Sequence, residues 1–253
     1  MEVLEKYFNH YIINARFKPA LFVLMPIAIT TLAWCPEAKQ LGGFVLTFLI
    51  TFGVMTFLSN QVSNLGNQLQ DKLFSDWGGA PTTILLRHSD DTLDVHTKQR
   101  YHKWLQSKLP DLIMPSFDGE ASDTINTDHK YASATNFLRE HARNKEKYPM
   151  VYSDNVAYGF ARNLLVLRPI GIGVSLVCII LNIALLFAYF NHYEQSIPIF
   201  VESHISIVIF GILATVASVC LLFFYVFFIN SVSVHGRAFR YAKSLLAVCE
   251  ERS

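Results

Sequence analysis

The stretch PIGIGVSLVCIILNIALLFAYF, residues 169–190, contains no acidic or basic side chain. Its length matches the roughly 20 apolar residues that a helix needs to cross a hydrocarbon core about 30 Å thick. A second uncharged run, residues 205–229, is at least as long. Both runs predict transmembrane helices, and they place the chain among membrane proteins.

Two shorter apolar runs, residues 20–35 and 42–59, lie near the N-terminus. Each is short enough to be a buried helix, but only PEAKQL, residues 36–41, separates them. Lys18 can extend its ammonium group away from the end of the first run. We therefore predict a tight transmembrane hairpin here, and a second hairpin formed by the two longer runs.

The composition supports the same class of protein. The chain is 52% hydrophobic and 16% charged, with 20 Phe and 11 Tyr, which is too apolar and too aromatic for an ordinary soluble domain. We predict an all-α membrane protein in which two transmembrane helical hairpins flank a mostly helical cytoplasmic domain, and in which several copies assemble. Its predicted parts are an amphipathic N-terminal segment (1–19), the first hairpin (20–59), a cytoplasmic sensor or interaction domain (60–163), the second hairpin (164–229) and a cytoplasmic C-terminal helix (230–253).

Lysine and arginine are unevenly distributed around the apolar runs. The loop 191–204 contains neither, whereas basic residues cluster before the first run, before the third run and after the fourth run. Because cytoplasmic loops carry the excess of positive charge, both termini and the middle domain are predicted to face the cytoplasm. The expected location is the bacterial inner membrane, with the lipid bilayer as a partner.

The stretch SNQVSNLGNQLQ, residues 59–70, contains no charged residue, although serine, asparagine and glutamine fill most of it. Apolar residues recur across it at steps of three and four, which predicts that the helix of the second run continues beyond the membrane with an apolar stripe. The stripe either packs on the chain's own middle domain or joins copies in a homo-oligomer. Its residues are Leu58, Val62, Leu65 and Leu69.

The polar residues of this helix are candidates for a pore wall. If copies assemble through the stripe, the amides line a neutral, water-filled vestibule, and two threonines one turn apart continue the polar line into the membrane. The competing interpretations are that the amides meet bulk water and that the hydroxyls bond their own backbone. The pore-lining candidates are Thr47, Thr51, Ser59, Asn60, Asn64 and Asn67.

Small residues one turn apart in the longer runs predict close packing between helices. Asn182, deep in the run 169–190, predicts an internal contact between helices rather than a site. Pro169 predicts a kink or a restart of the helix that leads into this run. The small-residue pairs are Gly171 with Ser175, Gly211 with Thr215, and Ala214 with Ser218.

The middle region shows helical spacing in residues 98–109 and 127–144. The segment between them is rich in turn-forming residues and is predicted to be a loop. Extended structure is predicted, if anywhere, in WGGAPTTILLRHSDD, residues 77–91.

Basic and aromatic side chains gather in the first part of this region. They provide donors to phosphate and surfaces on which bases stack, so they predict a nucleotide or oligonucleotide ligand. A second cationic strip, Arg139 with Arg143, Lys145 and Lys147, either adds to such a site or attracts anionic lipid. The ligand-binding candidates are Arg87, His88, Lys98, Arg100, His102 and Trp104.

Enzyme chemistry has one candidate stretch, RHSDDTLDVH, residues 87–96. Histidine and aspartate ligate several divalent ions, but the spacing here matches no zinc or calcium pattern. The favoured interpretation is a solvated loop in which Thr92 or Asp94 starts a helix. Because GxSxG, HExxH and CxxC motifs are absent from the sequence, we expect no catalysis, no bound metal and no cofactor. A membrane-anchored metal-dependent hydrolase is kept as a minor hypothesis.

The segment WGGAPTTILLRHSDDTLDVHTKQRYHKWL, residues 77–105, set between two predicted hairpins, resembles a family of bacterial membrane proteins. The layout is also similar to membrane effectors of antiphage defence, in which a cytoplasmic region senses a nucleotide or oligonucleotide signal and the spans disrupt the membrane. The resemblance covers most of the chain and rests on architecture, so no functional residue is transferred. It implies a soluble partner such as a nucleotidyltransferase.

These observations predict an oligomeric inner-membrane channel or pore-forming effector, gated by a ligand or partner that binds the middle domain. The leading alternative is a non-conducting membrane scaffold or assembly subunit that recruits a soluble partner.

Overall fold

The computed structural model describes residues 10–35, 41–194 and 202–251. Within these ranges the regular structure is helical and no strand occurs. The all-α class is therefore confirmed for this part of the chain. The prediction of extended structure in residues 77–91 is wrong, because helix α5, Pro81–Leu86, lies in the middle of that stretch.

The local sequence explains why α5 forms there. Pro81 occupies the first turn, where its missing N–H would have no partner in any case. Gly78 and Gly79 adopt φ values of 82° and 146°, which favour glycine, and they make the turn that precedes the helix. Leu85 and Leu86 are fully buried, so packing stabilises a helix that is too short to persist alone.

The described helices fall into two compact units. Unit 1 comprises Met1–Gly66 with Phe160–Ser231, and unit 2 comprises Asn67–Gly159 with Val232–Ser253. Helices α4 and α9 each contribute residues to both units. Unit 1 contains α2 (His10–Ile12), the π-helical turn η1 (Ile13–Phe17), α3 (Lys18–Trp34), the first part of α4 (Leu41–Asp76), most of α9 (Pro149–Glu194) and α10 (Glu202–Phe227).

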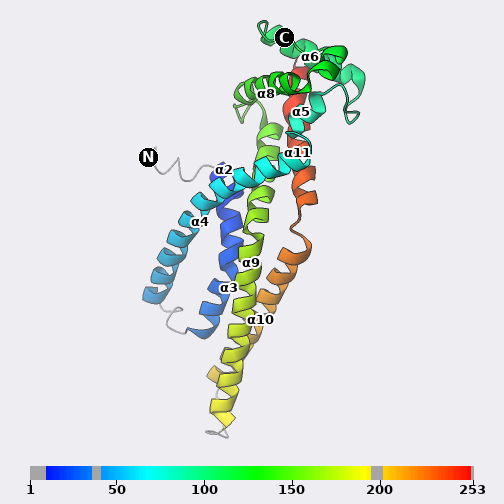
Figure 1. Ribbon diagram of the computed structural model, residues 1–253. Coiled ribbons are helices and arrows are strands. Elements are labelled where there is room, and N and C mark those ends of the chain that lie inside the picture. The colour runs from blue at the N-terminus through cyan, green and yellow to red at the C-terminus, as the bar shows by residue number, and fades with distance from the viewer. Residues whose placement is uncertain (1–9, 36–40, 195–201, 252–253) are drawn as a thin grey trace. The chain divides into compact units, whose positions relative to one another are not determined.

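Three helices of the described chain are long and apolar enough to cross a membrane: His10–Trp34, Pro149–Asn191 and Ser206–Phe227. Figure 1 shows the corresponding helices α3, α9 and α10 side by side. This finding supports a membrane protein. The fourth predicted span, residues 42–59, lies in α4, and the connections 36–40 and 195–201 lie outside the described residues, so the four-span layout stays a prediction.

Asn182 makes the interhelical contact that its position predicts. Its side chain is fully buried, and Nδ2 donates a 3.0 Å hydrogen bond to Thr30 Oγ1. Trp34 Nε1 donates a 2.8 Å hydrogen bond to Asn182 Oδ1. The amide thereby satisfies polar groups of α3 from within α9, in a region where water is not expected to do so.

Small residues allow close helix packing, as predicted. A Cβ atom on Gly171 would clash with the Tyr225 ring, and one on Gly211 would lie 2.7 Å from Trp34. Ala214 and Ser218 are also fully buried. These residues let side chains of neighbouring helices approach the backbone directly.

Helix α9 continues through Pro169 without a break. The helix therefore does not restart at this residue, and the kink, which was the other predicted outcome, stays a prediction. Membrane helices tolerate proline where neighbouring groups support the surrounding turns. Here Arg168, the preceding residue, donates 3.1 Å hydrogen bonds to the carbonyl oxygens of Tyr225 and Val226, at the end of α10.

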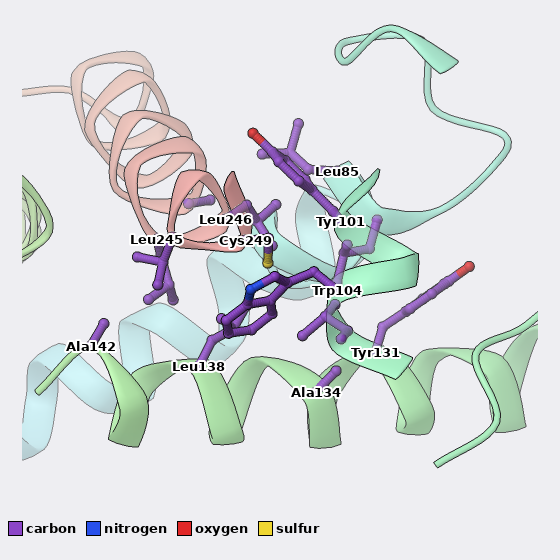
Figure 2. Packing of buried hydrophobic residues seen from close by; sticks show 14 of the residues in the cluster. Leu85, Tyr101, Trp104, Tyr131, Ala134, Leu138, Ala142, Leu245, Leu246 and Cys249 are labelled. Atoms are coloured by element: carbon purple, nitrogen blue, oxygen red, sulfur yellow. The ribbon is translucent and has the colours of Figure 1, made fainter. Parts of the chain in front are cut away.

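Unit 2 is built around a core of aromatic and aliphatic side chains, shown in Figure 2. Trp104 and Leu138 come from the middle region, whereas Leu245, Leu246 and Cys249 come from the C-terminal residues. The predicted C-terminal helix 230–253 thus contributes to the core formed by the middle region. Besides α5, the helices of this unit are α6 (Val95–Lys108), α7 (Phe117–Ser122), α8 (Thr124–His141), α11 (Ser231–Leu246) and the 3-10 helix η3 (Ala247–Glu250).

Candidate functional site

Helix α4 carries a face of uncharged amides. Asn60, Gln61 and Asn64 are exposed in unit 1, and the next amides along the helix, Asn67 and Gln68 of unit 2, are exposed as well. Within unit 1, steps of four and three residues place Asn64 beside Asn60 and Gln61 on one side of the helix. The described structure therefore leaves a neutral polar surface with hydrogen-bonding capacity toward solvent.

The opposite side of α4 is packed. Ser59 and Val62 are 1% and 0% exposed, and Gly66 is buried. The prediction of one continuous helix is confirmed, but of these three packed residues only Val62 belongs to the predicted apolar stripe. Ser59, predicted to line a pore, instead lies on this packed side.

The six pore-lining candidates do not share one face. A helical rotation of about 100° per residue places half-buried Thr51 near the packed side rather than beside Asn64. The side chain of Thr47 lies outside the described residues. From Asn64 toward the start of α4, steps of seven lead to Phe57 and Ile50, which are 62% and 59% exposed. The amide face therefore continues as an apolar face.

The predicted apolar stripe is divided between different environments. Val62 is buried within the chain, Leu58 and Leu69 are half-buried, and Leu65 is 41% exposed. Val62 packs in a cluster with Val23 and Leu164, which belong to the two predicted hairpins and not to the predicted middle domain. Assembly of copies through this stripe stays a prediction.

A buried polar contact holds α4 close to α9. The side chain of Asn163 is 1% exposed, and its Nδ2 donates a 2.6 Å hydrogen bond to the carbonyl of Ala15, inside the π-helical turn η1. Its Oδ1 accepts from the Arg162 guanidinium at 3.4 Å. A Cβ atom on Gly66 would clash with Asn163 Oδ1 and would lie 3.2 Å from Arg162 Nε. Glycine therefore permits this approach between α4 and α9.

Most ligand-binding candidates are engaged within unit 2. Arg87 forms a two-point ion pair with Asp128, with Nε to Oδ1 at 2.9 Å and Nη2 to Oδ2 at 2.6 Å, and Nη2 also donates to Gly78 O at 2.8 Å. Lys98 is 4% exposed, and its ammonium donates to the carbonyls of Arg87, at 2.6 Å, and Asp90. These cations stabilise the connection between α5 and α6.

The two candidate histidines also bind backbone carbonyls. Nε2 of His88 donates to Pro115 O at 3.0 Å, and Nε2 of His102 donates to Leu86 O at 2.9 Å. His102 is 7% exposed, and this burial lowers its pKa to about 4, with a further contribution from nearby His88. His102 is therefore neutral near pH 7 and supplies no positive charge for a phosphate.

Glu120 is the acceptor at the centre of this region, and sequence reasoning missed it. Its Oε2 accepts from His88 N and the Tyr131 hydroxyl, both at 2.8 Å, and its Oε1 accepts from Ser89 N at 3.1 Å and Ser89 Oγ at 3.0 Å. Burial raises the pKa of Glu120, but these hydrogen bonds outweigh it, and the net pKa lies below its usual value. Its position in a turn-rich segment carries no signal of such a role.

The last two candidates have different environments. Trp104 is 9% exposed and belongs to the unit 2 core, so it offers little surface for stacking. Arg100 is 54% exposed and pairs with Glu250 of η3 at 2.8 Å. It is therefore the accessible cation of the predicted set.

The next residue of the tail, Glu251, lies in a second cluster of donors. Lys147 Nζ is 2.6 Å from Oε1, and the Tyr148 hydroxyl donates to Oε2 at 2.7 Å. His141 Nε2 lies 3.5 Å from the same Oε2. The hydrogen bond from Lys147, followed by that from Tyr148, lowers the pKa of Glu251 to about 2, and the pairing raises the pKa of Lys147 to about 12.

Two aspartates of residues 87–96, Asp90 and Asp94, have structural partners. Asp90 accepts from the backbone and hydroxyl of Thr92, each at 3.0 Å. Asp94 caps α6 by accepting from Thr97 N at 2.9 Å, as the solvated-loop interpretation predicts. Among the described residues no group of three or more His, Cys, Asp or Glu side chains is placed to hold a metal ion.

Comparison with family models, with curated proteins and with solved structures finds no match for this chain.

Proposed function

We propose that the protein is an oligomeric inner-membrane channel or pore-forming effector, gated by a ligand or partner that binds unit 2. The observation that supports this proposal is the exposed amide face of α4, which continues into exposed Phe57 and Ile50. Asn60 and Asn64 follow the predicted span 42–59, where they would surround the mouth of a lumen shared between copies, whereas Phe57 and Ile50 lie within the span.

In the proposed pore, the two parts of the α4 face have different tasks. Asn60 and Asn64 form a neutral vestibule that holds water and admits ions of either sign. Phe57 and Ile50 form an apolar constriction, which conducts only when it is wide enough to be wetted. A small displacement of α4 in each copy then opens or closes the pore.

Unit 2 is the proposed receiver of the signal. Helix α4 is continuous from Leu41 to Asp76, and its residues after Gly66 belong to unit 2. A ligand that binds one conformation of unit 2 better than another shifts the equilibrium of that helix by its difference in affinity. In antiphage defence such a signal is a nucleotide or oligonucleotide made by a partner such as a nucleotidyltransferase.

The proposal is tested by membrane potential in bacteria that express the chain alone and with its genomic neighbours. We expect depolarisation of the wild type under at least one condition. The double variant N60L/N64L removes the polar vestibule and is expected to abolish it, whereas Phe57→Ala widens the constriction and is expected to increase it. Asn126→Leu makes the same chemical change at an exposed position of α8 and serves as the control.

A steady potential under all conditions, with the protein present in the membrane, contradicts the pore. Equal depolarisation by the wild type and N60L/N64L removes the amide face from the mechanism. Purified protein in liposomes, assayed for ion flux with and without a candidate nucleotide, separates gating from expression effects.

A second function, a membrane scaffold that recruits a soluble partner, is supported by a different observation. Three of the most exposed large apolar side chains of unit 2 come from one short segment: Ile113, Phe117 and Ile125 are 73%, 68% and 74% exposed. A contiguous exposed apolar patch often marks a protein interaction site, and we propose that these three side chains contribute to one. The scaffold predicts a stoichiometric partner that copurifies with the wild type and is lost from I113S/F117S/I125S, without any ion flux.

A further inference from the structure

The C-terminal residues Glu250 and Glu251 place two carboxylates next to donors from two distant segments of unit 2. Arg100, from the first predicted basic group, approaches Glu250 with Nε at 3.0 Å and Nη2 at 2.8 Å from Oε1. Lys147, from the second cationic strip, lies 2.6 Å from Glu251 Oε1. The fold thus brings both basic groups to consecutive acidic residues.

The surroundings of Glu251 are those of an anion site. An ammonium, a phenolic hydroxyl and an imidazole, from Lys147, Tyr148 and His141, converge on one carboxylate. The Tyr148 hydroxyl also lies 3.1 Å from His141 Nε2, which orients the two groups. Phe137 stacks on the His141 ring with centroids 5.8 Å apart, so a partly exposed aromatic surface adjoins the charged groups.

The chemistry of these donors suits phosphate. Arginine presents several parallel N–H groups, lysine supplies a compact charge, and a tyrosine hydroxyl donates to an oxyanion. Consecutive residues Glu250 and Glu251 each bind a cation, so a ligand with more than one phosphate could contact both cations. The pairs are partly exposed, with Arg100 at 54% and Lys147 at 53%, so solvent and ligand reach them.

We propose that Glu250 and Glu251 occupy a polyphosphate-binding site of unit 2 and that a nucleotide with two or more phosphates displaces them. Exposed ion pairs contribute little to stability, because water and salt screen them. A ligand with several phosphate charges therefore competes effectively with two single carboxylates. The base of the nucleotide stacks beside His141 and Phe137.

Displacement has a structural consequence within unit 2. The residues just before the two glutamates, Val248 and Cys249, are 6% and 4% exposed in the core. Loss of the glutamate contacts frees the end of η3 and weakens the hold on α11, the helix that follows α10 in the chain. Without a ligand, the protein's own glutamates therefore occupy the proposed site, and a bound ligand displaces them. This inference rests on the proposed function only for its effect on conduction.

Direct binding to the full-length protein in detergent tests the inference, with ATP and inorganic triphosphate as probes. We expect E250Q/E251Q to bind ATP about tenfold more tightly than the wild type, because the competing carboxylates are gone. R100Q/K147Q also releases Glu250 and Glu251. It is expected to lose ATP binding, because the two cations that would bind the phosphates are gone. E140Q/E146Q makes the same change in net charge on the same part of unit 2 and is expected to bind as the wild type does.

Hydrogen exchange of residues 246–251 provides a readout that does not depend on ion flux. We expect ATP to accelerate exchange there in the wild type, and R100Q/K147Q to exchange fast without ATP. If inorganic triphosphate binds as tightly as ATP, the site recognises the phosphates and the base contributes no affinity. The inference is overturned if neither the wild type nor E250Q/E251Q binds ATP or triphosphate. It is also overturned if E140Q/E146Q gains as much ATP affinity as E250Q/E251Q does. Both outcomes are independent of the conduction assays.

Discussion

The side-chain amide of Asn163, in α9, donates a 2.6 Å hydrogen bond to the backbone carbonyl of Ala15, in the π-helical turn η1. A π-helical turn changes the pattern of backbone hydrogen bonds, and here a carbonyl within it accepts from a side chain of another helix. The Oδ1 atom of the same Asn163 side chain faces Gly66 of α4. One asparagine therefore meets two other helices of unit 1.

Gly66→Ala is expected to destabilise unit 1. The added methyl group would clash with Asn163 Oδ1, and Arg162 Nε would lie only 3.2 Å away. Displacing these buried groups is expected to cost about 1–3 kcal/mol. Thermal unfolding in detergent measures the loss. Gly53→Ala is the matched control in the same helix: its Cβ has no neighbour within 4 Å, so stability should be unchanged or slightly higher.

Asn182→Leu is expected to weaken the contact between α3 and α9. The substitution removes the hydrogen bond to Thr30 and leaves Trp34 Nε1 without its acceptor. The expected loss of stability is on the order of 1 kcal/mol, typical of polar contacts between membrane helices. Thr215→Val, whose hydroxyl bonds only the Gly211 carbonyl of its own helix among the contacts described, should change stability less. Equal losses in the two variants would contradict a special role for Asn182.

His102→Gln is expected to flatten the pH dependence of unit 2 stability. The pKa of His102 is lowered from 6.5 to about 4 in the folded state, so the unfolded chain takes up a proton first on acidification. The stability associated with the neutral imidazole is complete above pH 6.5 and falls between pH 6.5 and 4, by about 3 kcal/mol. Glutamine keeps a donor toward Leu86 O but does not titrate.

The measurement for His102 is thermal unfolding at pH 7.5 and pH 4.5. The drop between the two pH values should be smaller in H102Q than in the wild type. His96→Gln, at an exposed position of the same helix, should leave the drop unchanged. An identical drop in H102Q and the wild type would show that other groups set the acid response.

Leu245→Ala is expected to destabilise unit 2, although residue 245 is far from the middle region in sequence. Leu245 is fully buried in the core that Trp104 and Leu138 form. Truncation of a buried leucine typically costs about 2–5 kcal/mol. The measurement is proteolysis of residues 67–159 in the full-length protein. Lys243→Ala, at an exposed position of α11, should leave the rate of proteolysis unchanged. If L245A is cleaved as slowly as the wild type, α11 does not stabilise this core.

Some of the fold was predictable because its causes are local. The apolar runs 169–190 and 205–229 are long enough to cross a membrane by their length and composition alone. Asn182 and the small residues were predictable because polar and small side chains in an apolar run have few roles other than helix packing. The short helix α5 was missed, because buried contacts of Leu85 and Leu86 stabilise a segment with weak helical periodicity.

The candidate site was less predictable, because each basic residue had many possible acceptors along the chain. Arg87 reaches Asp128, 41 residues away, and Arg100 reaches Glu250, 150 residues away. The same cationic residue type thus serves a half-buried structural pair in one case and an accessible pair in the other. Charge and spacing do not distinguish these outcomes, since only the fold decides which carboxylate lies within reach.

The sequence by itself determined the helical class, the apolar runs, the continuation of α4 past residue 59 and the absence of charge on its amide face, because these follow from periodicity and side-chain polarity. Only the tertiary structure decided which side of α4 packs, that Glu120 collects four hydrogen bonds, and that the C-terminal glutamates meet Arg100 and Lys147. These features depend on contacts between distant residues. Such contacts are chosen by how the helices pack together, and no local pattern encodes them.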